Sequence, residues 1–220
     1  DNATVGSVEV TDFPVLPDFD PSVFRSLATN YISVAPGNNS TVSNICIAAG
    51  SNLKFGNNVT IRGIVYVESP NRISFGNNAR IEGVIIFEKS SGTPGEDKFT
   101  IPNSAEFYPI PGDSQYDAVR EATAGYAILA PTAAVTINNN LNVNGSIIAD
   151  TISIKNNASA TLNDGIILAY SSHANAITVG NGGKLTFNSS GEVTVPSQGI
   201  SDKAARAYAY DPAGYREVVK

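Results

Sequence analysis

The chain has 220 residues, of which 42% are hydrophobic, so it can bury a core and is not expected to be disordered. Charged residues make up only 15% of the chain and its formal net charge is −6, whereas ordinary globular proteins contain roughly 25% charged residues. This acidic balance argues against nucleic acid or an anionic membrane surface as a partner. No apolar stretch approaches the roughly 18 residues of a membrane span.

Residues 1–12 form an arm ahead of the rest of the chain. Apolar and polar residues alternate in it, with Val8 and Val10 on one face, which predicts a short β-strand. Such an arm can add as a strand to the edge of a neighbouring subunit, and a frayed terminus is the alternative. The chain has no methionine, even at position 1. We therefore expect Asp1 to begin a mature or trimmed product that is exported.

Residues 13–34 are expected to form a cap over the first end of the fold. Asp20 is a good N-cap residue, and Pro21 stands at the first helical position of the short helix that follows. The apolar face of this helix consists of Val23, Phe24, Leu27 and Ala28. A stack of strands needs such covers because exposed sheet edges pair with other chains.

A repeat of 20 residues is the strongest pattern in the sequence. Residues 55–68 read FGNNVTIRGIVYVE, and residues 75–88 read FGNNARIEGVIIFE. Weaker copies occur at 36–49, 137–149, 154–169 and 179–195. A fixed period near 20, with strand-like halves and Asn-Gly turns, is typical of stacked coils.

The repeat predicts an all-β fold: a right-handed parallel β-solenoid, or β-helix, over residues 35–200. Equivalent side chains of neighbouring coils should stack, and asparagines should occupy the left-handed corners. The expected pairs are Phe55 with Phe75, Ile61 with Ile81, Val65 with Ile85 and, as an amide ladder, Asn57 with Asn77. Asn-Gly turns are also a hairpin signal, so an antiparallel β-sandwich is the alternative.

Residues 90–125 interrupt the repeat, and the solenoid is expected to resume at Tyr126. The segment is rich in proline and acidic residues, as expected of a long excursion from the coil. Insertions of this kind often form the recognition surface of a solenoid. Phe107, Tyr108 and Tyr116 are its candidate recognition residues, and exposed aromatic rings there would favour carbohydrate binding.

The last part of the chain, residues 201–220, is expected to form a helix and a tail. Ser201 can cap a short helix over 202–209, which leaves residues 210–220 as the tail. This helix would serve as the second cap of the stack.

No set of residues predicts a catalytic centre. Glu68 and Glu88 are repeat equivalents that would stack about 5 Å apart, a spacing that also fits retaining glycoside hydrolysis. Charge at the exit of an apolar strand is, however, more often a solubility device. His173 is the only histidine and Cys46 the only cysteine, and neither lies in a catalytic motif. We therefore expect a protein that is not an enzyme and has no catalytic residues.

Calcium is the one cofactor that the acidic residues leave open, and no other is expected. It could lie between stacked carboxylates, or in the loops that contain Glu96 with Asp97 and Asp113 with Asp117. The sequence contains neither an EF-hand loop nor the glycine-rich calcium repeat of β-helices.

Two segments resemble known solenoid families. YAILAP at 126–131, VNGSIIAD at 143–150 and ISIKNNA at 152–158 resemble the C-terminal β-solenoid region of PilX-type pilus-assembly proteins, over residues 126–170. The Gly-Asn-Asn coils at 55–88 are similar to bactofilin-type polymer-forming proteins. These resemblances imply an exported role in the cell envelope or a pilus and carry over no catalytic residue.

The expected function is that of a secreted or cell-surface structural protein associated with a pilus or filament. Its expected partners are copies of itself or other surface proteins. Carbohydrate binding or adhesion through the 90–125 insertion is the alternative. A polysaccharide-active enzyme and an ice-binding protein are less favoured; ice binding needs a regular threonine row, and Arg80 breaks that row opposite Thr60.

Overall fold

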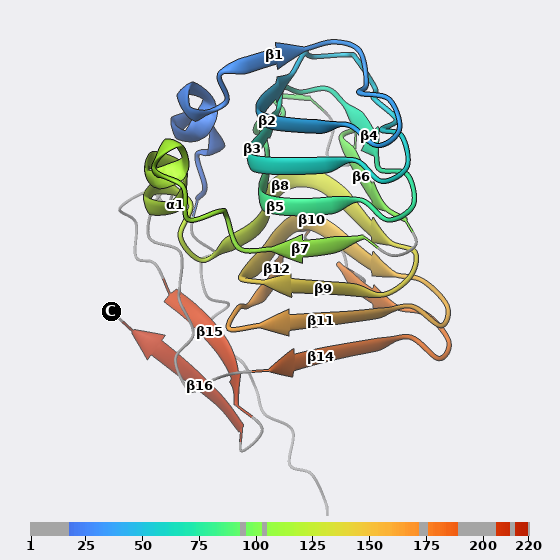
Figure 1. Ribbon diagram of the computed structural model, residues 1–220. Coiled ribbons are helices and arrows are strands. Elements are labelled where there is room, and N and C mark those ends of the chain that lie inside the picture. Colours follow the sequence, from blue (N-terminus) through green and yellow to red (C-terminus); the bar gives the residue numbers. More distant parts are fainter. Residues whose placement is uncertain are drawn as a thin grey trace, which may run out of the picture.

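The computed structural model describes residues 18–92, 96–102, 105–171 and 176–188, together with the backbone of residues 206–211 and 214–219. This part of the chain is mostly β-structure, with one large sheet of parallel strands and few helices (Figure 1). The strands lie one above another, so that the sheet bends into a stack of coils (Figure 1). None of the described helices is long and apolar enough to cross a membrane.

The elements of the stack are short. Its strands are β1 (Asn30–Ile32), β2 (Thr41–Ile47), β3 (Thr60–Val67), β4 (Arg72–Ser74), β5 (Arg80–Phe87), β6 (Lys98–Ile101), β7 (Glu106–Tyr108), β8 (Tyr126–Ile137), β9 (Leu141–Asn144), β10 (Ser146–Ile154), β11 (Ser159–Asn163), β12 (Ile167–Ala169), β13 (Ile177–Val179) and β14 (Lys184–Asn188). The helical segments are η1 (Pro21–Leu27), η2 (Ser114–Tyr116) and α1 (Asp117–Ala122).

Within the described residues the strands of the stack pair in three ladders. The first ladder contains the first halves of β2, β3 and β5, followed by β7, β9, β11 and β14. The second contains β1, the second halves of β2, β3 and β5, the first halves of β8 and β10, and β12. The third contains β4, β6, the second halves of β8 and β10, and β13. The longer strands bend round a corner and therefore belong to two ladders.

The register between β3 and β5 is the predicted offset of 20 residues, from Thr60 opposite Arg80 to Val67 opposite Phe87. It confirms the expected pairing of Ile61 with Ile81 and of Val65 with Ile85. The rings of Phe55 and Phe75 also stack as predicted, with centroids 4.8 Å apart. Because the pairs in these ladders are parallel, the structure does not fit the alternative of an antiparallel sandwich.

The apolar run after Gly63 is buried on both faces of the sheet. Val65 and Val67 point into the stack and join its main core. Ile64 and Tyr66 point outward, where they form a second cluster with Phe24 and other apolar side chains of η1 and α1. The run is continuous and not alternating because both faces of this strand are covered.

Asparagines hold the corners between the third and first ladders. Asn58 and Asn78 have φ values of 55° and 56°, in the left-handed region that asparagine tolerates. The predicted ladder is present in two forms. Asn77 N donates to Asn57 Oδ1 at 2.9 Å, and the amide-to-amide bond, Asn78 Nδ2 to Asn58 Oδ1 at 3.2 Å, lies one residue further along.

Glycines occupy the corner between the first and second ladders because neighbouring coils approach too closely for a side chain. A Cβ atom built on Gly83 would lie 1.8 Å from the carbonyl oxygen of Gly63. Gly63 itself has a φ of 79°. This pair therefore requires glycine for close approach at one position and for backbone conformation at the other.

The N-terminal segment does not cap the end of the stack, as the sequence predicted. η1 begins after Asp20, which accepts a hydrogen bond from Ser22 N as a capping residue should. Phe24 is buried against the outer face of the second ladder, whereas Val23 is exposed. η1 lies beside the stack together with α1 (Figure 1), because the outward apolar side chains of β3 and β5 need a cover there.

The predicted insertion is shorter than 90–125. β6 pairs with β4 and β8 in the third ladder, and β7 pairs with β5 in the first. Residues 98–101 and 106–108 therefore belong to the coils. Residues 109–125, which contain η2 and α1, are the true excursion, and the coil resumes at Tyr126 as expected.

The expected helix over 202–209 is wrong where the structure describes this segment. β15 (Arg206–Asp211) and β16 (Gly214–Val219) form an antiparallel hairpin. Alanine and tyrosine alternate over 207–210, a period of two that favours a strand. Pro212 and Gly214 supply the turn between the two strands in the sequence.

Candidate functional site

The two glutamates at strand exits make equivalent bonds to the backbone of the preceding coil. Glu68 Oε2 accepts from Ala49 N at 3.3 Å, and Glu88 Oε2 accepts from Ser69 N at 3.1 Å. Both bonds span 19 residues. The pair considered as catalytic therefore satisfies backbone donors at the corners, which is a structural role.

Glu68 is engaged further by two side chains. Arg25 Nη2 lies 2.5 Å from Glu68 Oε1, and Tyr31 Oη donates to Oε2 at 3.0 Å. Burial raises the pKa of Glu68, but the hydrogen bonds from Arg25, Tyr31 and the Ala49 N–H outweigh it and lower the pKa overall. Glu68 is therefore ionised at neutral pH and is not suited to act as a general acid.

Cys46 is buried beside Glu68 and is not an activated thiol. Burial, followed by the charge of Glu68, raises the pKa of Cys46 to about 11. A neutral thiol is a weak nucleophile. Its role is therefore to pack in the outer apolar cluster, as the sequence indicated.

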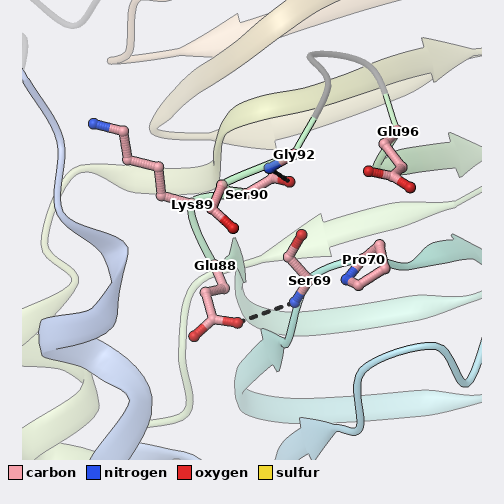
Figure 2. A pocket seen from close by; sticks show the side chains of 8 residues that line it. Ser69, Pro70, Glu88, Lys89, Ser90, Gly92 and Glu96 are labelled. Carbon is pink, nitrogen blue, oxygen red and sulfur yellow. Dashed lines mark hydrogen bonds between the residues drawn. The ribbon is translucent and has the colours of Figure 1, made fainter.

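A polar pocket of about 480 Å³ lies beside the exit of β5. It is lined by Ser69, Pro70, Glu88, Lys89, Ser90, Ser91, Gly92 and Glu96. Figure 2 shows Glu88 turned towards the Ser69 N–H, with Glu96 at the other side of the pocket. Lys89 points away from both carboxylates (Figure 2) and pairs with Asp18 at 2.6 Å.

Asp97 is fully buried next to this pocket. Its carboxylate accepts from Ser69 Oγ at 2.7 Å and from Asn71 N at 2.5 Å. Burial raises the pKa of Asp97, and these two bonds only partly oppose the effect. Asp97 thus holds the corner at Asn71 in place.

The expected calcium loops do not assemble a metal site in the part of the chain that the structure describes. Among those residues no group of three His, Cys, Asp or Glu side chains is placed to hold a metal ion. Asp117 is instead paired with Arg120, three residues along α1. Calcium binding therefore has no support from the arrangement of Glu96, Asp97, Asp113 and Asp117.

The predicted aromatic recognition residues do not share a surface. Phe107 is buried in the main core, because it stands opposite Ile81 in the register of β7 with β5. Tyr116 is also buried, with its hydroxyl 3.1 Å from Ser43 Oγ. Only Tyr108 faces outward and is half-buried. The expectation of an exposed aromatic cluster is therefore wrong.

Tyr108 lines a surface notch where the excursion leaves the first ladder. The notch has a volume of about 410 Å³ and is lined by Arg62, Arg80, Glu82, Tyr108, Pro109, Pro111 and Asp113. The sequence analysis missed its three charged residues on β3 and β5. A signal was present, because Arg62 and Glu82 are opposite charges at equivalent positions of a repeat that is otherwise poor in charge.

Glu82 organises the notch. Its two carboxylate oxygens accept from Arg62 Nε at 2.7 Å and from Arg80 Nε at 2.6 Å. The guanidinium of Arg80 lies over the Tyr108 ring, 3.7 Å from its centroid. Burial raises the pKa of Glu82, but the bonds from Arg80 and Arg62 outweigh it, so the pKa is lowered and the group is ionised at neutral pH.

Exposed apolar side chains concentrate at the two ends of the stack. Among the described residues the large exposed ones are Val23, Tyr31, Val34, Ile177 and Val179. All but Val23 belong to the first or last coils, and Val34 and Val179 are 77% and 46% exposed. Within the same part of the chain, β1 pairs only with β2, β13 only with β10 and β14 only with β11.

Three residues singled out in the sequence lie outside the described residues: Val8 and Val10 of the arm, and His173. Comparison with models of known protein families, with curated protein sequences and with solved structures finds no match for this chain.

Proposed function

We propose that this chain is a structural protein of the cell surface or the extracellular space, built as a right-handed β-solenoid that joins end to end into a filament. Parallel strands joined by crossover connections are right-handed in nearly all known cases, which supports that hand for the coil. The low charge and the resemblance to pilus-assembly proteins support an exported, pilus- or filament-associated role.

The observation that carries the proposal is the position of the exposed apolar side chains. Tyr31 and Val34 mark the first coil, and Ile177 and Val179 mark the last coils. Apolar side chains beside unpaired strand edges are the usual features of a surface that adds further strands.

The order of the ladders favours contact between opposite ends. β14, the last described strand of the stack, belongs to the first ladder, so a further coil would continue in the second ladder next to β12. β1 is the strand that starts the second ladder. A second copy could thus continue the stack with its own β1, and such a head-to-tail contact does not close on itself.

The glutamates support a structural role over a catalytic one. Glu68 is held by Arg25, Tyr31 and the backbone of Ala49, and Glu88 by the backbone of Ser69. Ice binding is not favoured, because Thr60 stands opposite Arg80 in the register.

A pair of end variants tests the proposal. Val34→Lys should block the first end and Val179→Lys the last end, and Val23→Lys, an exposed change on η1, is the matched control. The wild type and the Val23 variant should grow in mass with concentration in light scattering and form filaments in negative-stain electron microscopy. Each end variant alone should be monomeric, because a buried unpaired charge at the contact opposes association.

Mixing the two end variants gives the sharper result. Each retains one intact end, so together they should form a 1:1 dimer and stop. Wild type that stays monomeric at every concentration would overturn the proposal. A mixture that forms no dimer, or a Val23→Lys variant that fails to assemble, would equally remove the ends as the site of contact.

A further inference from the structure

The notch beside the excursion has the position of a binding site. Its floor comes from outward side chains of β3, β5 and β7: Arg62, Arg80, Glu82 and Tyr108. Its wall comes from Pro109, Pro111 and Asp113, where the chain leaves the coil. The volume of about 410 Å³ lies in the range of small-ligand sites.

The floor is held in place before any ligand arrives. Glu82 fixes both guanidiniums through their Nε atoms, and the Tyr108 hydroxyl donates to Glu106. Arg80 in turn rests on the Tyr108 ring. Side chains fixed on strands lose little conformational freedom on binding, which favours affinity. Arg62 and Arg80 nevertheless remain 45% and 44% exposed.

The charges of the notch balance. Two guanidiniums, on Arg62 and Arg80, face two acidic residues, Glu82 and Asp113. An anion would meet the carboxylates and a cation the guanidiniums, so neither is favoured. A hydroxyl group both donates and accepts hydrogen bonds, and it can use both kinds of partner.

We propose that the notch binds a neutral sugar unit of a polysaccharide. The guanidiniums donate to its hydroxyl oxygens, and the carboxylate of Asp113 accepts from its hydroxyl groups. Pro109 and Pro111 offer an apolar wall to the C–H face of the sugar ring. This site is separate from the ends of the stack, so it does not depend on the proposed assembly.

Nuclear magnetic resonance tests the proposal directly. The Nε–H signals of Arg62 and Arg80 are followed during titration with cellohexaose and maltohexaose as neutral probes. Polygalacturonate and chitosan serve as the acidic and cationic probes. At least one neutral probe should shift both signals in a saturable way, while the signal of Arg72, an exposed arginine on β4, should not move.

Variants give a second readout by calorimetry. Arg62→Gln and Arg80→Gln should each weaken binding of the neutral probe by about tenfold or more, a loss typical of a charged hydrogen-bond donor. Arg72→Gln should bind as the wild type does. Chemical denaturation of each variant checks that the coil remains folded.

Three results would overturn the proposal. These are neutral probes that leave the Arg62 and Arg80 signals unmoved, binding that survives both substitutions, and binding of polygalacturonate or chitosan in preference to the neutral probes. Filament formation by Arg62→Gln is expected to be unchanged, so a failure here and a failure of end-to-end assembly are distinguishable.

Discussion

Asparagine and glycine hold different corners of the coil for different physical reasons. Asn58 and Asn78 combine a left-handed backbone with a side-chain amide that bonds to the next coil. Gly83 has no such conformational demand; its requirement is space against the backbone of Gly63. The two residue types are therefore not interchangeable at these corners, although both are common in turns.

Substitution of Gly83 by alanine should destabilise the protein strongly. The new Cβ atom would lie 1.8 Å from the Gly63 carbonyl oxygen, and backbone atoms of a packed coil cannot move aside cheaply. We expect a loss of about 3 kcal/mol or more in the free energy of unfolding, at the upper end for overpacked sites. Urea denaturation measures it.

Gly37→Ala is the matched control, because no atom lies within 4 Å of a Cβ built there. It should be neutral or stabilise the protein by about 0.5 kcal/mol, since alanine restricts the unfolded chain. Equal losses for both variants would contradict the steric explanation.

Asp97 should make stability fall as pH rises just above the ordinary aspartate pKa of 3.8. Its pKa is raised by burial, with Glu96 and Glu88 adding to the effect, so the folded state keeps the proton to a higher pH than the unfolded state. In that window the folded state binds more protons, and raising the pH therefore favours unfolding.

Asp97→Asn removes this dependence while Asn Oδ1 can still accept from Asn71 N. Relative to the wild type, the variant should gain in free energy of unfolding between about pH 3 and about pH 7. Denaturation curves at several pH values give the difference. A difference that is constant, or that shrinks with rising pH, would show that Asp97 is not a protonated buried acid at low pH.

At the scale of elements, the coils keep the register of their ladders while the length of chain between them varies. β3 and β5 are offset by 20 residues, β5 and β7 by 26, and β7 and β9 by 36. Only the first offset repeats the sequence, so sequence identity could reveal β3 and β5 but not β6 or β7. The extra residues lie in the corner after β5 and in the 109–125 excursion.

The same irregular spacing explains why the candidate site was only partly predictable. Phe107 would have been recognised as a core residue had Glu106-Phe107-Tyr108 been aligned with Arg80-Ile81-Glu82, but the 26-residue offset hid that alignment. The lateral position of η1 was hidden for another reason. The amphipathic pattern shows that a helix covers an apolar face but does not show which one.

Hydrogen exchange should rank the elements by their place in the stack. Amides of β3, β5, β8 and β10 have neighbouring strands on both sides and, in the second ladder, a cover of helices. They should exchange slowest, and those of β1 and β14 at the ends fastest, because a stack opens from its ends. Mass spectrometry of peptic fragments measures this order. Uniform protection from β1 to β14 would indicate an all-or-none unit instead.

At the scale of the whole molecule, the N-terminal arm remains a prediction alongside the end-to-end contact. Residues 1–12 were predicted to add a strand to a neighbour, with Val8 and Val10 on the contacting face. Deleting residues 1–11 should then leave a folded monomer that no longer forms filaments.

The deletion variant also separates the arm from the open ends of the stack. If the shortened protein still assembles, and Val34→Lys in the same background stops it, the ends alone make the contact and the arm is a frayed terminus. Circular dichroism provides the control that the shortened chain keeps its strands.

The identical register of β3 and β5 makes the length of this molecule countable in residues. Inserting a second copy of residues 60–79 would add one rung, about 4.8 Å, and place every corner asparagine and glycine where the neighbouring rung needs it. Gene duplication within such a segment changes reach without redesigning a core. The unit from Thr60 to Ala79 is thus a ready cassette, by which descendants or engineers can set the span of the rod one rung at a time.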